Sequence, residues 1–199
     1  MAQLLYQGHS SFRLTTASGK VIYIDPFAGE GYKPIADLIL ITHEHYDHND
    51  VSKVPMSERT IIIRAKDGLN GGVYRNFDYF GLHIQAVPAY NEHHDRSQCV
   101  GYLVDAEGVR LYFAGDTSYT DYMPTLGKMG IDYAMLPIDG IFNMGPEEAT
   151  RCSAIINPRH LLPIHQKPGM LWDYHQCMKV TSPVAMLVKP GETITLIHG

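Results

Sequence analysis

The sequence predicts a layered α/β fold in one domain, and three observations support that prediction. The chain has 199 residues, of which 45% are hydrophobic and 19% charged, which suits one globular domain with its own core. Short β-prone runs alternate with segments that carry helix signals, and no Pro-, Gly- or Ser-rich linker interrupts them. Several apolar runs end at polar residues that include histidine or aspartate. We therefore expect a single domain over residues 1–199.

The first half is expected to be mostly strands. The run at residues 37–42 has no polar alternation, which is typical of an interior strand covered on both faces. Asn49-Asp50 can cap a short helix after it. The other strands expected in this half are residues 4–7, 11–15, 21–25, 60–64, 73–80 and 82–88.

The second half is more regularly α/β. Residues 100–105 and 109–114, joined by Ala106-Glu107-Gly108, predict a hairpin. Pro146 suits the first position of a helix over residues 147–156. The remaining expected elements are helices at residues 119–129 and 172–179 and strands at residues 131–137, 159–164 and 193–197.

Four potential metal ligands follow the buried run at residues 37–42, in the order His-x-His-x-Asp-His. In an extended loop, positions two apart point the same way, so His43 and His45 can share one cation. A turn after them lets Asp47 and His48 face a second cation beside the first. An ordinary polar loop could also contain histidines, but this spacing favours a metal site.

Two further strand ends carry potential ligands. Asp116 follows Gly115 directly after residues 109–114, and its carboxylate could bridge two cations. His165 ends the apolar run that precedes it, and ligands cluster at such strand ends in open α/β sheets. Because these donors are imidazoles and carboxylates without thiolates, zinc, manganese and iron are all acceptable, and we expect two Zn²⁺ ions, with Mn²⁺ next.

Together with Gly8-His9-Ser10-Ser11-Phe12, Ile24-Asp25-Pro26-Phe27 and Val87-Pro88-Ala89-Tyr90-Asn91, these motifs resemble the metallo-β-lactamase superfamily of metal-dependent hydrolases. They are most similar to the small branch that includes the phosphorylated-ascorbate lactonases. The resemblance covers nearly the whole chain. It implies a four-layer αβ/βα sandwich, with two mixed sheets face to face, helices outside and the metals at one sheet edge.

The resemblance also implies roles for individual residues. His43 and His45 would bind the first metal, and Asp116 would bridge the pair. A third histidine for the first metal is expected at His94, with His93 and Asn91 as the alternatives. The ligands implied for the second metal are Asp47, His48 and His165.

Two other residues of these motifs have a functional and a structural interpretation. Asp25 could hold a ligating histidine from behind or could simply end a strand in a turn. His9 could donate a proton at the mouth of the pocket or could only pack there. The expected catalytic residues are Asp47, Asp116 and His9.

Two cations about 3.5–4 Å apart would lower the pKa of a bridging water and supply hydroxide at neutral pH. We therefore expect hydrolysis of a small ester, lactone or phosphoester substrate, with Arg96, Arg110 or Lys167 available to meet a negative charge. An iron-dependent redox enzyme on the same ligands is the alternative from another class. A metal-binding module without catalysis is the third interpretation.

Composition excludes several other classes. A net charge of −5 disfavours a nucleic-acid partner, and no apolar run approaches the roughly 20 residues of a membrane span. The three cysteines fit neither a disulfide framework nor a thiolate zinc site, so we expect a reducing cytoplasm. The expected partner is a small-molecule substrate, and a homo-oligomer is left open.

Overall fold

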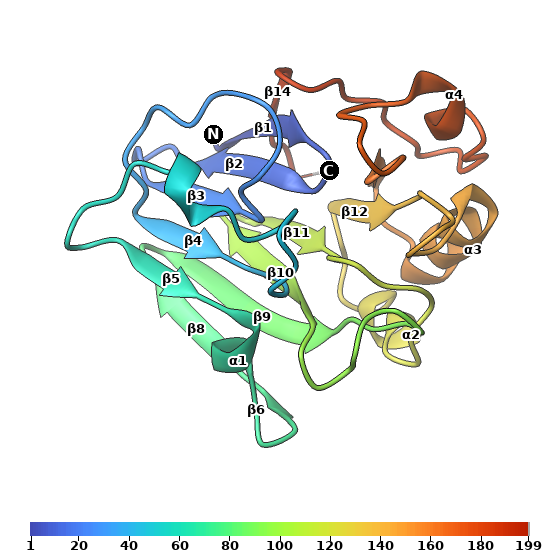
Figure 1. Cartoon of the computed structure of the whole chain (residues 1–199), viewed down its shortest axis with the longest axis horizontal. Coiled ribbons are helices and arrows are strands. Elements are labelled where there is room, and N and C mark those ends of the chain that lie inside the picture. Colours follow the sequence, from blue (N-terminus) through green and yellow to red (C-terminus); the bar gives the residue numbers. More distant parts are fainter. Residues whose placement is uncertain (199) are drawn as a thin grey trace.

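The computed structural model describes residues 1–198, which build two larger mixed sheets and a small hairpin (Figure 1). The first sheet has the strand order β14-β1-β2-β3-β4-β5. It is antiparallel from β14 to β3 and parallel from β3 to β5. Its strands are β1 (Gln3–Gly8), β2 (Ser11–Thr15), β3 (Val21–Ile24), β4 (Leu38–Leu40), β5 (Ile61–Ile63) and β14 (Thr193–Thr195).

The second sheet has the order β13-β12-β11-β10-β9-β8. It is antiparallel from β8 to β11 and parallel from β11 to β13. Its strands are β8 (Asn76–Tyr79), β9 (Leu82–Pro88), β10 (Val100–Ala106), β11 (Val109–Phe113), β12 (Tyr133–Pro137) and β13 (His160–Ile164). The hairpin pairs β6 (Leu69–Asn70) with β7 (Val73–Tyr74).

The main core lies between the two sheets, where inward side chains of both meet. The rings of Phe12 on β2 and Phe113 on β11 pack edge to face across it, with centroids 5.5 Å apart. Phe12 and Leu14 from the first sheet and Ile84 and Tyr102 from the second are fully buried there. At about 25 cal/mol per Å² of buried apolar surface, such residues supply most of the stabilisation of the fold.

The outer faces of the sheets are covered differently. Helices α2 (Met123–Leu126), α3 (Pro146–Ile156) and α4 (Tyr174–Cys177) lie beyond the second sheet, as Figure 1 shows on the right. The first sheet is covered by the loop after β3 and by the 3₁₀ turn η1 (Val51–Lys53), which bury Tyr23 and Ile39. The layered α/β fold class is confirmed. On the outer face of the first sheet, a loop and one 3₁₀ turn take the place of the longer helices that were expected. Helix α1 (Ala65–Gly68) follows β5.

Helix lengths differ most from expectation. Within residues 119–129, only α2 is helical. At the start, the backbone N–H of Tyr119 donates to the Glu148 side chain and so lies outside the helix. At the end, the backbone N–H groups of Lys128 and Met129 donate to the third residue before them, as in a 3₁₀ turn. The segment 172–179 is helical only over α4, where the Asp173 side chain caps the first turn. Helix α3 starts at Pro146 as expected.

The direction of the strands determines where polar side chains gather. Strands β3 and β4 of the first sheet run parallel, and so do β11, β12 and β13 of the second. The carboxyl ends of parallel strands meet at the same edge of a sheet. Within residues 1–198, no helix has the length and apolar character needed to cross a membrane.

Candidate metal centre

The predicted ligands follow directly from strand ends of both sheets. His43 lies three residues after the end of β4, and Asp116 lies three residues after the end of β11. His165 is the first residue after β13, and His94 lies in the loop that joins β9 to β10. Although the ligands are spread over more than a hundred residues of sequence, the structure brings them to one edge of the sandwich.

The potential ligand atoms form overlapping groups, in each of which they lie within 4.8 Å of one another. One group contains His43, His45 and His94. In the described part of the chain, the other groups are His9 with Asp47, His48 and His165, and His43 with His48 and Asp116. All the residues predicted as ligands therefore lie together, and His9 lies with them.

Asp116 occupies the centre of this arrangement. Its Oδ1 is 3.2 Å from Nε2 of His48. Its Oδ2 is 3.2 Å from Nε2 of His94 and 3.3 Å from Nε2 of His165. One carboxylate thus contacts histidines of both outer groups, which is the position that a bridging ligand requires.

His48, His94 and His165 each have a polar partner behind the ring, at the Nδ1 atom. The Nδ1 of His48 is 2.8 Å from Asp25 Oδ2, and that of His165 is 3.1 Å from Asp139 Oδ2. The Nδ1 of His94 is 2.9 Å from Asn91 Oδ1. Partners of this kind fix the ring and its tautomer, so Nε2 presents its lone pair toward the centre.

His43 is oriented through Thr42. The Thr42 hydroxyl donates to Asp25 Oδ2 at 2.6 Å, and its oxygen can therefore accept from Nδ1 of His43 at 3.1 Å. The backbone N–H of Thr42 donates to Asp25 Oδ1 at 2.8 Å. Asp25 consequently positions both His43 and His48 and stays almost fully buried.

The inward atoms fit a divalent cation. Among the described residues, Nε2 of His43, His48 and His165 and Oδ1 of Asp116 are buried without a hydrogen bond. Burying polar atoms unsatisfied costs about 1–3 kcal/mol each, so their convergence needs a compensating ligand. Imidazole and carboxylate donors at one point supply the ligand set that Zn²⁺, Mn²⁺ or iron accepts.

Electrostatics within the cluster are strong. Burial alone lowers the pKa of His48, but the carboxylates of Asp116 and Asp25 outweigh it and raise that pKa well above the ordinary value. Burial also opposes protonation of His165, yet Asp116 and Asp139 raise its pKa to about 9. Burial would raise the pKa of Asp116, but His48 and His165 lower it well below its usual range. The cluster therefore keeps carboxylate charge that protons or metal ions must balance.

His9 and Asp47 form a pair at the open side of the cluster. The Nε2 of His9 lies 3.1 Å from Asp47 Oδ2, and its ring centroid lies 3.8 Å from that of His165. His9 has φ of 56° in the turn between β1 and β2, a backbone conformation that non-glycine residues seldom adopt. Burial lowers the pKa of His9, which favours a neutral ring.

A cavity of about 650 Å³ opens over the ligands. His45, Asp47, Asp116 and His165 form part of its floor, and its walls include Phe27, Tyr46, Phe142, Met170 and Leu171. Its volume is in the range of small-molecule sites.

The basic side chains that the sequence suggested as substrate contacts are not part of the cavity lining. Arg110 is bound to Asp105 and to the carbonyl of Met129 beside a separate, smaller depression, and the guanidinium of Arg96 lies over the Tyr90 ring. In the described chain, none of Arg96, Arg110 and Lys167 lines the cavity. Arg96 and Arg110 are thus engaged outside the cavity, whereas Lys167 directly precedes Pro168 of its lining. That one of them meets a negatively charged substrate stays a prediction.

The structure separates the alternatives for the third ligand of the first group. The His94 side chain is buried within the group, whereas His93 is largely exposed and packs against Phe142. Asn91 contacts His94 from behind, so its oxygen faces Nδ1 of that ring rather than the centre.

Sequence reasoning missed Asp139, Thr42 and the apolar walls. Asp139 follows β12 by two residues, and its position after a parallel strand was the available signal. Thr42 precedes the first ligand directly, but a threonine at a strand end has many structural uses. The walls come from four separate loops, so no local pattern joins them.

Comparisons with known proteins agree with this geometry. The profile of the Beta-lactamase superfamily domain matches residues 3–165. A UPF0173 metal-dependent hydrolase of Thermococcus onnurineus is 31% identical over 226 aligned positions, which cover 98% of this chain and 100% of that protein.

Solved structures share the fold. Igni18, a metallo hydrolase from Ignicoccus hospitalis, superposes with a TM-score of 0.76 at 24% identity, covering 100% of this chain and 99% of that one. CmlA, a diiron β-hydroxylase from Streptomyces venezuelae, gives a TM-score of 0.71 at 16% identity, covering 98% and 54%. With the profile match and the identity to the Thermococcus protein, the chain belongs to the β-lactamase superfamily, beside the metal-dependent hydrolases with which it aligns.

Proposed function

We propose that this metal-dependent hydrolase cleaves a small ester, lactone or phosphoester with a pair of divalent cations. The observation that carries the proposal is the position of Asp116, whose two carboxylate oxygens contact histidines on both sides of the cluster. A carboxylate so placed can hold two cations at the short separation that two-metal sites use.

The ligands divide into two sets around Asp116. His43, His45 and His94 would hold the first ion, and Asp47, His48 and His165 the second. Two Zn²⁺ ions are our first choice and Mn²⁺ the next, because the set contains no thiolate. Ions bound in this way lower the pKa of water and polarise a carbonyl or phosphoryl oxygen.

The residues of the chain itself position the reactants. Asp25, Thr42, Asn91 and Asp139 hold four imidazoles in fixed orientations, which reduces the reorganisation that binding would otherwise require. The Nε2–H of His9 donates to Asp47 and fixes that carboxylate. His9 also lines the cavity and is the proposed proton donor to the leaving group, a step for which its ring must first take up a second proton.

A metal analysis combined with a substrate panel tests the function. The purified protein should contain close to two divalent ions per chain and should hydrolyse members of an ester, lactone and phosphoester panel. Asp47→Asn and His48→Ala should abolish activity and reduce metal content, whereas His83→Ala, on the exposed face of β9, should change neither. Full activity in the first two variants would eliminate the two-metal mechanism.

Iron-dependent oxidation is the second candidate. The donor set suits iron as well as zinc, and the diiron β-hydroxylase CmlA shares the fold. Oxygen consumption by the iron-loaded protein, with no turnover of any ester, lactone or phosphoester, would favour this candidate over hydrolysis.

We propose the cytoplasm as the compartment. Cys99, Cys152 and Cys177 are buried and form no disulfide within the described chain. Burial raises the pKa of the Cys99 and Cys152 thiols to about 12, which keeps both protonated and unreactive. Fractionation of cells that express the protein would test this location.

A further inference from the structure

The cavity over the candidate metal centre has a rim of exposed apolar side chains. Tyr46, Phe142 and Leu171 are 78%, 46% and 50% exposed, and Met170 is 43% exposed. All four line the same cavity. Clustered exposed apolar side chains beside a polar floor are typical of a binding site.

Contacts with the site hold this rim in place. The Phe27 ring packs edge to face on Tyr46 and on His9, with centroids 5.8 Å apart in both pairs. The backbone N–H of His9 donates to the carbonyl of Leu171 at 3.3 Å. The rim therefore presents its apolar surface without first having to fold around a ligand.

The wall that Phe142 forms is also held by contacts with the site. The backbone N–H of Phe142 donates to Asp139 Oδ1 at 2.7 Å, and its ring packs edge to face on His93 with centroids 5.7 Å apart. Asp139 also faces Nδ1 of His165. One carboxylate thus fixes both a candidate ligand and a wall of the cavity.

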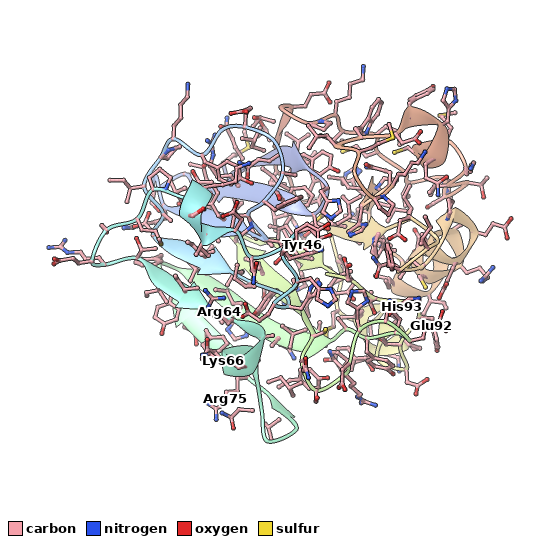
Figure 2. All side chains as sticks on the ribbon, in the orientation of Figure 1. Tyr46, Arg64, Lys66, Arg75, Glu92 and His93 are labelled. Carbon is pink, nitrogen blue, oxygen red and sulfur yellow. The ribbon has the colours of Figure 1, made fainter. Side chains whose placement is uncertain are left out.

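Lysine and arginine side chains are missing from the cavity lining within residues 1–198. Arg64, the cation on the side of the histidine-rich loop, is bound to Glu44 with Nη1 2.7 Å from the carboxylate. In Figure 2, Arg64, Lys66 and Arg75 lie together near α1, on the other side of Tyr46 from His93. A charged group that lies against the apolar walls, away from the candidate ligands, would therefore lose its hydration without gaining an opposite charge.

We propose that the substrate is an uncharged carboxylic ester or lactone whose apolar group lies against Phe27, Phe142, Met170 and Leu171. This inference rests on the proposed hydrolysis and specifies its substrate class. Water adds across the acyl carbon–oxygen bond: the acyl carbon gains the hydroxyl oxygen, the bond to the leaving oxygen breaks, and that oxygen takes the proton. The step needs no oxidant or reductant.

Turnover of a homologous series tests the apolar preference. The metal-loaded protein is assayed on p-nitrophenyl acetate, butyrate and hexanoate and on p-nitrophenyl phosphate. Because each buried methylene contributes about 0.8 kcal/mol, kcat/KM should rise about two- to fourfold per added methylene. The phosphate should be the poorest substrate, because it has no acyl chain to place against the apolar walls. Ester turnover that is flat along the series, or preference for the phosphate, would overturn the inference and leave the proposed hydrolysis standing.

Binding without turnover separates the inference from the proposed function. Methyl ketones of increasing chain length are uncharged and cannot be hydrolysed, and Trp172, the one tryptophan of the sequence, follows Leu171 directly. Titration monitored by Trp172 fluorescence should give affinities that rise about two- to fourfold per methylene. If this trend appears but no ester is hydrolysed, hydrolysis fails and the apolar site stands. Affinities that do not depend on chain length would overturn the site itself.

Two neighbouring residues provide a matched pair of variants. Phe142 and Ile141 are both exposed, and both donate a backbone N–H to Asp139 Oδ1 at 2.7 Å, but of the two only Phe142 lines the cavity within the described chain. Phe142→Lys should remove the chain-length preference in both assays, and Ile141→Lys should retain it.

Met170→Lys provides a second test on a different loop and should act like Phe142→Lys. Thermal melting checks that every variant is folded. If both cavity variants are folded and keep the wild-type chain-length dependence, the inference is wrong.

Discussion

At the scale of single residues, the candidate metal centre depends on side chains that do not reach its middle. Asp25, Asn91, Thr42 and Asp139 all contact the outer nitrogen of a histidine and leave its inner nitrogen free to bind. Asp139 has a further task, because three backbone N–H groups of the following loop converge on its Oδ1.

Asp139→Asn separates these two tasks. The amide oxygen can still accept from the loop, but the carboxylate that faces Nδ1 of His165 is lost. Partners behind a ligating histidine are worth about 10–100-fold in metal affinity, so we expect a loss of that size in a competition titration with a chelator. The melting temperature of the metal-free protein should fall as well, because Asp139 Oδ2 faces the protonated His165 ring and accepts from the Asn143 amide.

Asp78→Asn is the matched control for this variant. Asp78 also contacts Nδ1 of a histidine, His83, at 2.8 Å, but the pair is exposed and belongs to none of the candidate ligand groups. Its metal affinity should equal that of the wild type. Equal affinity for Asp139→Asn would show that Asp139 does not support His165.

Metal binding should release protons at neutral pH. Carboxylates raise the pKa of His165 to about 9 and that of His48 well above its ordinary value, although burial opposes both shifts. Without metal, both rings are therefore protonated at pH 7, and a ligating histidine must be neutral. Since protons compete with the ion, apparent affinity should rise with pH between 6 and 8.

Calorimetry in two buffers measures this release. The observed heat of metal binding should differ between phosphate and Tris at pH 7 by an amount that follows the ionisation heat of the buffer. Identical heats in the two buffers would mean that the rings are already neutral before the ion arrives.

At the scale of secondary structure, the ends of parallel strands position the centre, and polar contacts keep those strands in register. The Asp37 carboxylate, just before β4, accepts from Nζ of Lys20 at 2.8 Å and from the backbone of Val21 at 2.9 Å. These contacts tie the start of β4 to the start of β3, two strands that lead to Asp25 and His43.

Asp37→Asn should therefore destabilise the fold in a pH-dependent way. Burial would raise the pKa of Asp37, but its contact with Lys20 outweighs this and lowers the pKa. A depressed pKa contributes stability above the unfolded value, near 4, which is lost as the pH falls through the folded value. At pH 7 we expect a loss of about 1 kcal/mol.

Urea unfolding with a chelator present, at pH 7 and at pH 3, tests this expectation. The difference between Asp37→Asn and the wild type should shrink at pH 3, where the wild-type carboxyl also becomes protonated. The exposed Asp121→Asn serves as the control and should match the wild type at both pH values. If the difference in the free energy of unfolding is the same at pH 3 as at pH 7, the variant acts through its altered hydrogen bonding and packing and not through the lost charge.

The same scale explains which parts of the molecule could be predicted from the sequence. The strand expected at residues 37–42, observed as Leu38–Leu40, was predictable because its centre is uniformly apolar. The ligands after it were predictable because four of them fall within six residues. Strand β9 was predicted with its observed bounds, since turn residues flank it on both sides.

Other features depend on contacts that no local pattern encodes. The helix expected at residues 119–129 is shortened by the side chain of Glu148, which lies in another helix. The four-residue helix α1 is too short to show periodicity. Asp139 became recognisable only when the fold placed its carboxylate against His165.

At the scale of the whole molecule, the centre lies across both sheets. Asp25, His43 and His48 belong to loops of the first sheet, and Asp116 and His165 follow strands of the second. The apolar core between the sheets is extensive and does not include these residues. We therefore expect the protein to fold without metal and to become more stable when metal binds.

Removal of metal with a chelator should lower the melting temperature without unfolding the protein at 25 °C. A free metal concentration about 100-fold above Kd stabilises by about 2.7 kcal/mol, which corresponds to roughly 5–10 °C for a chain of this length. Differential scanning calorimetry before and after chelation measures the shift. A chelated sample without a cooperative transition would show that the core alone does not maintain the fold.

The edge-to-face pair of Phe12 and Phe113 lies where the two sheets meet. A smaller or larger side chain there would let one sheet slide against the other, by a fraction of an ångström at most in a close-packed interior. Because the candidate ligands come from both sheets, even that small slip would alter the distances between them. Tight packing in the core thus keeps the ligand distances within the narrow range that metal binding requires.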